Sequence, residues 1–219
     1  MTETKIAIAA PLRTAHAGGE IRCIHVSPDG QFCATASADG RAIVWNMHDC
    51  MPLMSVENGE DWTPVNSVAF SPDSRWLAIA SDRGSTPGNT VELHDLETGE
   101  KIVIPETAGA RLVAFNPEGA GGAERSGRGE IIVYNPEGKS NRKALAMPGG
   151  TSALAFSPDA RLLACGTFKE VKLWSTADFV ELHPITCHSG YVTGLAFSPD
   201  GRSLVSTSKE LAMTRFPRA

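Results

Sequence analysis

His16, Ser37 and Asp39 carry the three side-chain types of a hydrolytic triad. In such a triad a histidine accepts the proton of the serine hydroxyl, while a carboxylate orients the histidine ring. A working site also needs hydrogen-bond donors for the oxyanion, and the chain has no Gly-x-Ser-x-Gly turn to supply them. We therefore expect these residues to form a buried structural network, and we predict no catalytic residue.

The other histidines and the cysteines lack the spacing of a metal site. No HExxH sequence is present, and His183 and His188, five residues apart, have no matched cysteine or carboxylate partner. The cysteines are odd in number and form no CxxC pair; they are Cys23, Cys33, Cys50, Cys165 and Cys187. We expect small buried thiols in a reducing compartment, and we predict no metal and no cofactor.

Acidic residues that could suggest a glycosidase recur at one fixed place in the sequence. They are Asp29, Asp73, Glu118, Asp159 and Asp200. Each follows a proline in a phrase such as Ser-Pro-Asp-Gly, in which Pro fixes φ and Asp and Gly suit the next positions of a turn. Because the carboxylate occupies the same turn position each time, it indicates a turn and not an acid–base pair.

The phrase that contains these turns occurs five times: CIHVSPDG at 23–30, SVAFSPDS at 67–74, LVAFNPEG at 112–119, ALAFSPDA at 153–160 and GLAFSPDG at 194–201. Its marker residues Ser27, Ser71, Asn116, Ser157 and Ser198 are 44, 45, 41 and 41 residues apart. A period of about 40–45 residues is typical of a four-stranded propeller blade. Short apolar runs before and after each turn predict strands, so the chain is predicted to be all-β.

Over nearly the whole chain these repeats resemble those of the WD-repeat family. In the first repeat, Asp39-Gly40 is followed by Trp45-Asn46, where the family has Asp, Gly and a terminal Trp-Asp. The terminal positions of the five repeats are Trp45, His94, Tyr134, Trp174 and Phe216. The resemblance implies a β-propeller of antiparallel strands, in which His16, Ser37 and Asp39 join Trp45 in a hydrogen-bonded structural tetrad.

Five blade motifs are expected within a single domain that spans residues 1–219. Their approximate bounds are 16–56, 62–106, 109–148, 150–186 and 188–216, with an additional N-terminal strand at 5–9. In the third motif a Gly-rich stretch, 119–129, replaces the expected second strand, so this blade is expected to lack a strand or to have a mobile one. The fifth motif ends after three strands. The strand at 5–9 could supply the fourth and close the ring, or the ring could stay partly open.

Charge and hydropathy exclude several classes of partner. The net charge of -5 disfavours a nucleic-acid surface, which needs clustered Lys and Arg. The longest apolar run, 6–12, is too short to span a bilayer, and Glu3 and Pro11 make the N-terminus a poor signal peptide. We therefore expect a cytoplasmic protein with no nucleic-acid and no membrane partner.

Without catalytic residues, function is expected to lie in the surface loops. In the family, strand a is innermost in a blade, strand d is outermost, and partners bind the face formed by the d–a and b–c loops. The resemblance thus implies a non-enzymatic scaffold for protein–protein interaction. The candidate rim residues are Glu20, Arg22, Trp62, Asn66, Arg83, Arg111, Phe168, Tyr191, Thr193 and Lys209. Two alternatives remain open: an incomplete ring completed by a strand of a partner chain or by self-association, and a non-catalytic propeller fragment of a larger protein, which could be an enzyme.

Overall fold

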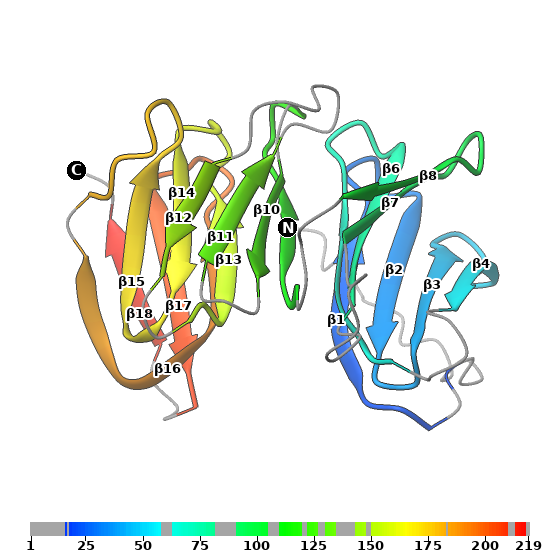
Figure 1. Cartoon of the computed structure of the whole chain (residues 1–219), viewed down its shortest axis with the longest axis horizontal. Helices are drawn as coiled ribbons and strands as arrows, with labels where there is room; N and C mark the ends of the chain where they lie inside the picture. The colour runs from blue at the N-terminus through cyan, green and yellow to red at the C-terminus, as the bar shows by residue number, and fades with distance from the viewer. Residues whose placement is uncertain are drawn as a thin grey trace, which may run out of the picture.

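The computed structural model describes residues 16, 18–57, 63–81, 91–104, 110–119, 122–126, 130–134, 143–147, 150–182, 184–209 and 213–217. Every regular element in these ranges is a β-strand, and the strands pair into four hydrogen-bonded sheets (Figure 1). Neighbouring strands run antiparallel throughout, as in the first sheet. The expected all-β, antiparallel architecture is confirmed.

The first two sheets each contain four strands in chain order, and we call them blades 1 and 2. Blade 1 consists of β1 (Ile21–Val26), β2 (Phe32–Ser37), β3 (Arg41–Asn46) and β4 (Pro52–Glu57). Blade 2 consists of β5 (Val65–Phe70), β6 (Trp76–Ser81), β7 (Val91–Asp95) and β8 (Lys101–Ile104). In both blades the first strand precedes the Ser-Pro-Asp turn and the second follows it, as the repeat predicts.

Blade 3 has four strands, although the sequence led us to expect a missing or mobile one. It consists of β9 (Val113–Phe115), β10 (Gly122–Ser126), β11 (Glu130–Tyr134) and β12 (Lys143–Ala146). The expectation that the Gly-rich stretch leaves this blade short of a strand is wrong, because β10 pairs with both β9 and β11. Only one of the five β10 residues is glycine, and pairing uses backbone N–H and C=O groups, so a segment without an apolar pattern can still form a ladder.

The last sheet joins two blades through one long strand. Its strands are β13 (Ala153–Phe156), β14 (Leu162–Gly166), β15 (Phe168–Ser175), β16 (Ile185–Phe197), β17 (Ser203–Ser208) and β18 (Met213–Pro217). The start of β16 pairs with β15 and completes blade 4, whereas its end pairs with β17 and begins blade 5. Blade 5 therefore has the three strands that the sequence predicts. The segment 5–9, predicted to add a fourth, lies outside the described residues.

A serine and a carboxylate hold the turn after the innermost strand in four blades, and in blade 3 the Asn116 side chain accepts the Glu118 N–H at 2.8 Å instead. The Ser27 hydroxyl donates to the Asp29 carboxylate at 2.6 Å and accepts from the Phe32 N–H at 2.8 Å. The hydroxyls of Ser71, Ser157 and Ser198 bond in the same way. The fourth turn residue has positive φ each time: Gly30 (72°), Ser74 (61°), Gly119 (76°), Ala160 (57°) and Gly201 (68°). In these four blades the repeated carboxylates thus serve the turns.

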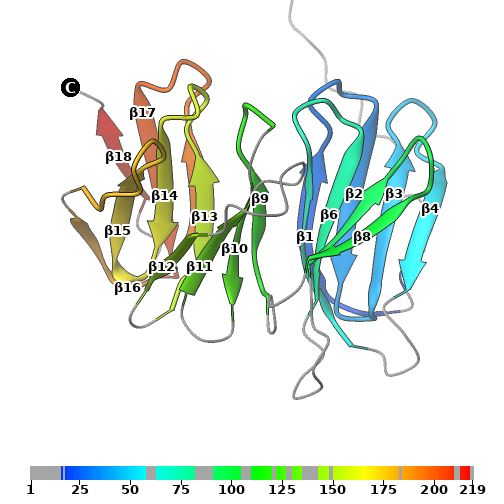
Figure 2. The same ribbon diagram turned by 45° about the horizontal axis from the view of Figure 1, so that its top comes forward.

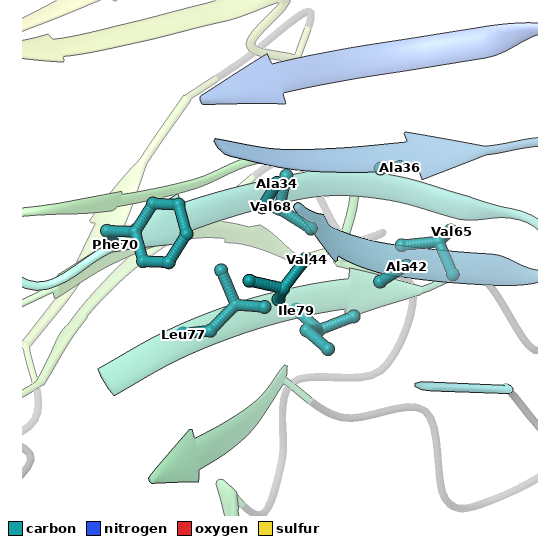
Figure 3. Close-up of a cluster of buried hydrophobic side chains, with 9 residues drawn as sticks. All are labelled: Ala34, Ala36, Ala42, Val44, Val65, Val68, Phe70, Leu77 and Ile79. Carbon is teal, nitrogen blue, oxygen red and sulfur yellow. The ribbon is translucent and has the colours of Figure 1, made fainter. Parts of the chain in front are cut away.

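The hydrophobic core lies between the blades. Val68 and Phe70 on one side of β5 pack against Ala34 and Ala36 of blade 1 (Figure 3). Ala69, on the other side of β5, belongs to the cluster shared with blade 3. Successive residues of a strand point to opposite faces, so each inner strand contributes to two joints. In this joint, Val68 and Phe70 of the later blade lie against small alanines of the earlier one, and Val44 of the earlier blade belongs to the same cluster.

The blades follow one another in chain order around a common hollow. Strands β1, β5, β9, β13 and β16 contact one another in that order, and they line a hollow of about 790 Å³. In both views blades 1 and 5 lie toward opposite sides of the molecule, with blade 3 between them (Figures 1 and 2).

Candidate protein-interaction face

A hydrogen-bonded network joins three of the four predicted tetrad residues in blade 1. His16 Nδ1 lies 2.9 Å from an Asp39 carboxylate oxygen, and His16 Nε2 lies 2.8 Å from the Thr35 hydroxyl. The Trp45 indole N–H donates to the same hydroxyl at 2.9 Å. The hydroxyl that links His16 to Trp45 therefore belongs to Thr35 and not to Ser37.

Ser37, two residues after Thr35, stabilises the following turn. Its hydroxyl accepts the backbone N–H of Asp39 at 3.1 Å and so shapes the turn between β2 and β3. Thr35 and Ser37 point to the same face of β2, but Thr35 pairs with Ile43 and lies closer to Trp45 along the strand. The register between β2 and β3, which residue types alone do not give, decides between the two hydroxyls.

In this network the His16 ring and the Asp39 carboxylate, which a hydrolase would need for catalysis, are already hydrogen-bonded. His16 and Asp39 are both buried, and each ring nitrogen of His16 has a partner. Burial alone would raise the pKa of Asp39, but hydrogen bonds from His16, Arg41 and Ser37 together hold that pKa below its ordinary value. A buried carboxylate held ionised in this way anchors the turn.

The terminal aromatic position occupies one register in all five blades. Each of these residues pairs with the residue six positions after the marker: Trp45 with Cys33, His94 with Leu77, Tyr134 with Gly122, Trp174 with Leu163 and Phe216 with Leu204. His94 therefore stands where blade 1 has its tryptophan. Its Nε2 lies 3.0 Å from Glu92, and hydrogen bonds from His94 and then Lys101 lower the pKa of Glu92 to about 2.

The hydroxyl position, eight residues after the marker, varies between blades. In blade 5 it is Ser206, whose hydroxyl lies 2.7 Å from His188 Nε2. In blade 4 it is Cys165, and the buried Trp174 indole N–H has no hydrogen-bond partner among the described residues. Burial raises the pKa of the Cys165 thiol, so that side chain stays a neutral thiol. The full network is thus found in blade 1 and is reduced in blades 4 and 5.

The antiparallel order places the candidate rim at one end of the sheets. The Ser-Pro-Asp turns lie at the opposite end, because strands a and b meet there. Arg22 donates to the Asn66 side chain at 2.5 Å, which links the start of β1 to the start of β5. Glu20, Arg111, Thr193 and Lys209 are exposed at the same end. Trp62 and Arg83 lie outside the described residues.

Two exposed aromatic side chains meet on this rim. Phe168 and Tyr191 are 50% and 52% exposed, and their ring centroids lie 5.1 Å apart at an interplanar angle of 60°. They form a register pair between β15 and β16. The Lys169 ammonium lies 5.1 Å from the Phe168 ring centroid, and Lys169 itself has a φ of 69°. The rim thus carries an aromatic pair with a cation beside it, which we call the aromatic patch.

The remaining chemistry of the described residues is sparse. No group of three His, Cys, Asp or Glu residues in the described ranges could hold a metal ion. Cys23, Cys33, Cys50 and Cys165 are free thiols. Among the described residues there is no helix long and apolar enough to cross a membrane. His183 and the side chain of Cys187 lie outside what the structure describes.

The family described as "WD domain, G-beta repeat" matches residues 9–46, 52–85 and 179–210. The small ribosomal subunit protein RACK1 of Schizosaccharomyces pombe is 34% identical over 93 residues, which are 42% of this chain and 27% of that protein. RACK1 of Caenorhabditis elegans is 32% identical over 101 residues, which are 44% of this chain and 28% of that protein. The chain thus matches little more than a quarter of the length of these relatives.

A solved structure matches nearly the whole chain. The β-propeller domain of Cps50 (Swd1) from Myceliophteria thermophila superposes with a TM-score of 0.78 at 18% identity. The match covers 96% of this chain and 68% of that domain. The five blades therefore have the fold of about two thirds of a larger propeller.

Proposed function

Because this chain belongs to the WD-repeat β-propeller family, we propose that it is a non-enzymatic scaffold that binds other proteins through its rim. The aromatic patch is the observation that supports this most directly. Exposed aromatic side chains are the residue types that most often dominate the binding energy of protein interfaces. The rings of Phe168 and Tyr191 already contact each other in a tilted arrangement, so little conformational entropy is lost when a partner covers them.

The chemistry of the partner is suggested by the basic residues of the rim. Lys169 and Lys209 are exposed, and Arg22 and Arg111 lie at the starts of the inner strands at the same end. The chain as a whole has a net charge of -5, so this basic character is local. We propose that the partner presents an apolar or aromatic anchor flanked by carboxylates.

Two relatives are small ribosomal subunit proteins, and this suggests a second, more specific partner. We propose a cytoplasmic location and include proteins of the small ribosomal subunit among the candidate partners. Co-sedimentation of the purified chain with small subunits checks this proposal. Absence of the chain from the subunit fraction would remove the ribosome from consideration and leave the scaffold proposal in place.

The scaffold proposal is tested by removing the aromatic patch. The double variant Phe168→Ala with Tyr191→Ala should lose most of the proteins captured by the wild-type chain, quantified by mass spectrometry. The matched control is Val180→Ala with Leu182→Ala, two exposed apolar residues at the opposite end of the same blade, which should capture the wild-type set. Equal capture by both double variants would contradict the proposed rim, and turnover of any member of a broad substrate panel would contradict a non-enzymatic role.

A further inference from the structure

Among the residues that the structure describes, nothing covers one side of the innermost strand of blade 1. Cys23 and His25 point toward blade 2: the Cys23 thiol lies 3.6 Å from the Val68 carbonyl, and His25 Nδ1 accepts the Phe70 N–H at 3.2 Å. Ile24 and Val26 alternate with them and therefore point the other way. Ile24 is 65% exposed and Val26 is 47% exposed, and Ile21 is exposed at the start of the strand. We call Ile21, Ile24 and Val26 the leading face.

The same repeat positions in blade 2 are fully covered. Counting back from the markers Ser27 and Ser71, Ile24 corresponds to Val68 and Val26 to Phe70. Val68 is 1% exposed and Phe70 is 2% exposed, because both pack on the small residues of blade 1. The leading face thus has the composition of an internal joint, but no blade in the described part of the chain packs against it.

The opposite end of the chain of blades shows the complementary half of a joint. Leu195 and Phe197 of β16 pack toward blade 4, so Ala196 points away from it. Ala196 and Thr207 are exposed and Val205 is half-buried, whereas the equivalent Ala69, Ala80 and Ala78 of blade 2 are buried. We call Ala196, Val205 and Thr207 the trailing face. The leading face therefore resembles one side of an internal joint between blades, and the trailing face resembles the other side.

We propose that the leading and trailing faces dock a unit of about two further propeller blades that lies outside residues 1–219. The match to Cps50 sets the size of this unit. Five blades account for about two thirds of that domain, so the remaining third has room for about two blades of the same period. A second copy of this chain would bring five blades, too many for that space, so it could meet only one face at a time. The occupant that satisfies both faces is a two-blade unit.

The internal joints indicate which side chains each side of this unit must have. The side that meets the leading face needs small residues such as the Ala34 and Ala36 that receive Val68 and Phe70. The side that meets the trailing face needs large apolar residues like Val68 and Phe70 themselves. Contiguous exposed apolar residues of this kind mark interaction surfaces on soluble proteins. This proposal does not depend on binding at the rim.

The proposal is tested by supplying such a unit in a known geometry. A second copy of residues 16–104, which carry blades 1 and 2, is fused after the full chain. The added copy of blade 1 then offers its leading face to Ala196, and the added copy of blade 2 offers its Ala69 and Ala80 side to Ile24. The fusion should be monomeric, with a Tm at least about 5 °C above that of the parent chain.

The decisive measurement is the effect of Ile24→Lys on the Tm of the parent chain and on the Tm of the fusion. In the parent chain this variant should shift Tm by less than about 1 °C, whereas in the fusion it should lower Tm by more than about 5 °C. Leu53→Lys, at an exposed apolar residue of outer strand β4, should be neutral in both. An equally small effect of Ile24→Lys in parent and fusion would overturn the proposal.

A second measurement applies if the fusion does not fold. The parent chain should bind a hydrophobic fluorescent dye, and Ile24→Lys combined with Val26→Lys should reduce that signal by about half or more. No change in dye binding would mean that the leading face is not available and would overturn the proposal. The Phe168→Ala, Tyr191→Ala variant, which tests the rim, should leave the Tm of the fusion unchanged, so the two proposals fail separately.

Discussion

Strands β1 and β5 are built from the same repeated phrase, and they differ in what lies beside them. The apolar residues of β5 are buried on both sides, while those of β1 are half-buried on one side and exposed on the other. Burial in this fold is therefore decided by the neighbouring blade and not by the strand's own sequence. A repeat protein gains most of its stability from such nearest-neighbour contacts, so its end blades carry surfaces unlike those of its middle.

The largest expected difference follows from placing a charge at the two equivalent positions. Val68→Lys should lower the free energy of unfolding by about 4–5 kcal/mol, since an unpaired ammonium would be buried in the joint of Figure 3. Ile24→Lys should change it by less than about 0.5 kcal/mol, because its side chain already faces water. Urea denaturation of both variants measures the difference. Similar losses at the two sites would remove the distinction between a joint and an end face.

A second difference lies between the buried hydroxyl of the blade 1 network and an exposed hydroxyl of the rim. Thr35→Val should lower the free energy of unfolding by about 2–3 kcal/mol, because it leaves His16 Nε2 and the Trp45 indole N–H without their shared hydroxyl. Thermal unfolding followed by circular dichroism measures the loss. Thr193→Val removes an exposed hydroxyl and should be neutral within about 0.5 kcal/mol. A neutral Thr35→Val would mean that the network contributes no stability.

The repeat is predicted from the sequence more accurately than the hydrogen-bonded network of blade 1. The marker spacing places the first strands and the turns correctly in all five blades, because Pro, Asp and Gly restrict the backbone locally. The sequence predicts Ser37 as the hydroxyl of the tetrad, whereas Thr35 makes the contacts with His16 and Trp45. Both are strand hydroxyls on one face, and only the cross-strand register separates them.

Blade 3 and the end faces mark two other limits of the sequence. The Gly-rich stretch 119–129 gives no apolar pattern, yet β10 forms within it because its neighbours offer free backbone groups. The exposure of Ile24 could not be read from the phrase CIHVSPDG, since the equivalent Val68 is buried in a similar phrase. In both places a neighbouring strand or blade decides the outcome.

Blade 4 offers the reverse of the Thr35 experiment. Cys165→Ser introduces a hydroxyl of similar volume at the position where blade 1 has Thr35 and blade 5 has Ser206. It should raise the free energy of unfolding by about 0.5–1 kcal/mol, because the buried Trp174 indole N–H gains an acceptor. Urea denaturation checks the sign. A loss of stability would show that the indole is satisfied in another way.

The smallest expected effect is a pH dependence that arises at the joint of β1 and β5. Burial lowers the pKa of His25 below 6.5, and its Nδ1 accepts the Phe70 N–H, so the folded chain holds this ring neutral. The unfolded chain therefore binds the proton more readily. The contribution to stability is complete above about pH 6.5 and is lost as pH falls through the lowered pKa of the folded state.

Thermal unfolding between pH 7.5 and 5 measures this dependence. His25→Asn keeps an acceptor for the Phe70 N–H but cannot titrate, so its Tm should fall less than that of the wild type over this range. His48→Asn changes an exposed histidine and should follow the wild-type curve. Parallel curves for the wild type and His25→Asn would assign the pH dependence to other groups.

The difference between an internal joint and an end face is tested most directly by thiol labelling at one repeat position. Ala69→Cys lies in the joint of blades 2 and 3, and Ala196→Cys lies on the trailing face of blade 5. Iodoacetamide modification, resolved by site with mass spectrometry, should proceed at Ala196→Cys within about tenfold of the unfolded chain's rate. At Ala69→Cys it should be slower by about 100-fold or more, because labelling there requires local opening. Equal protection at the two sites would contradict the account, since it would mean that the trailing face is covered and the ring is closed.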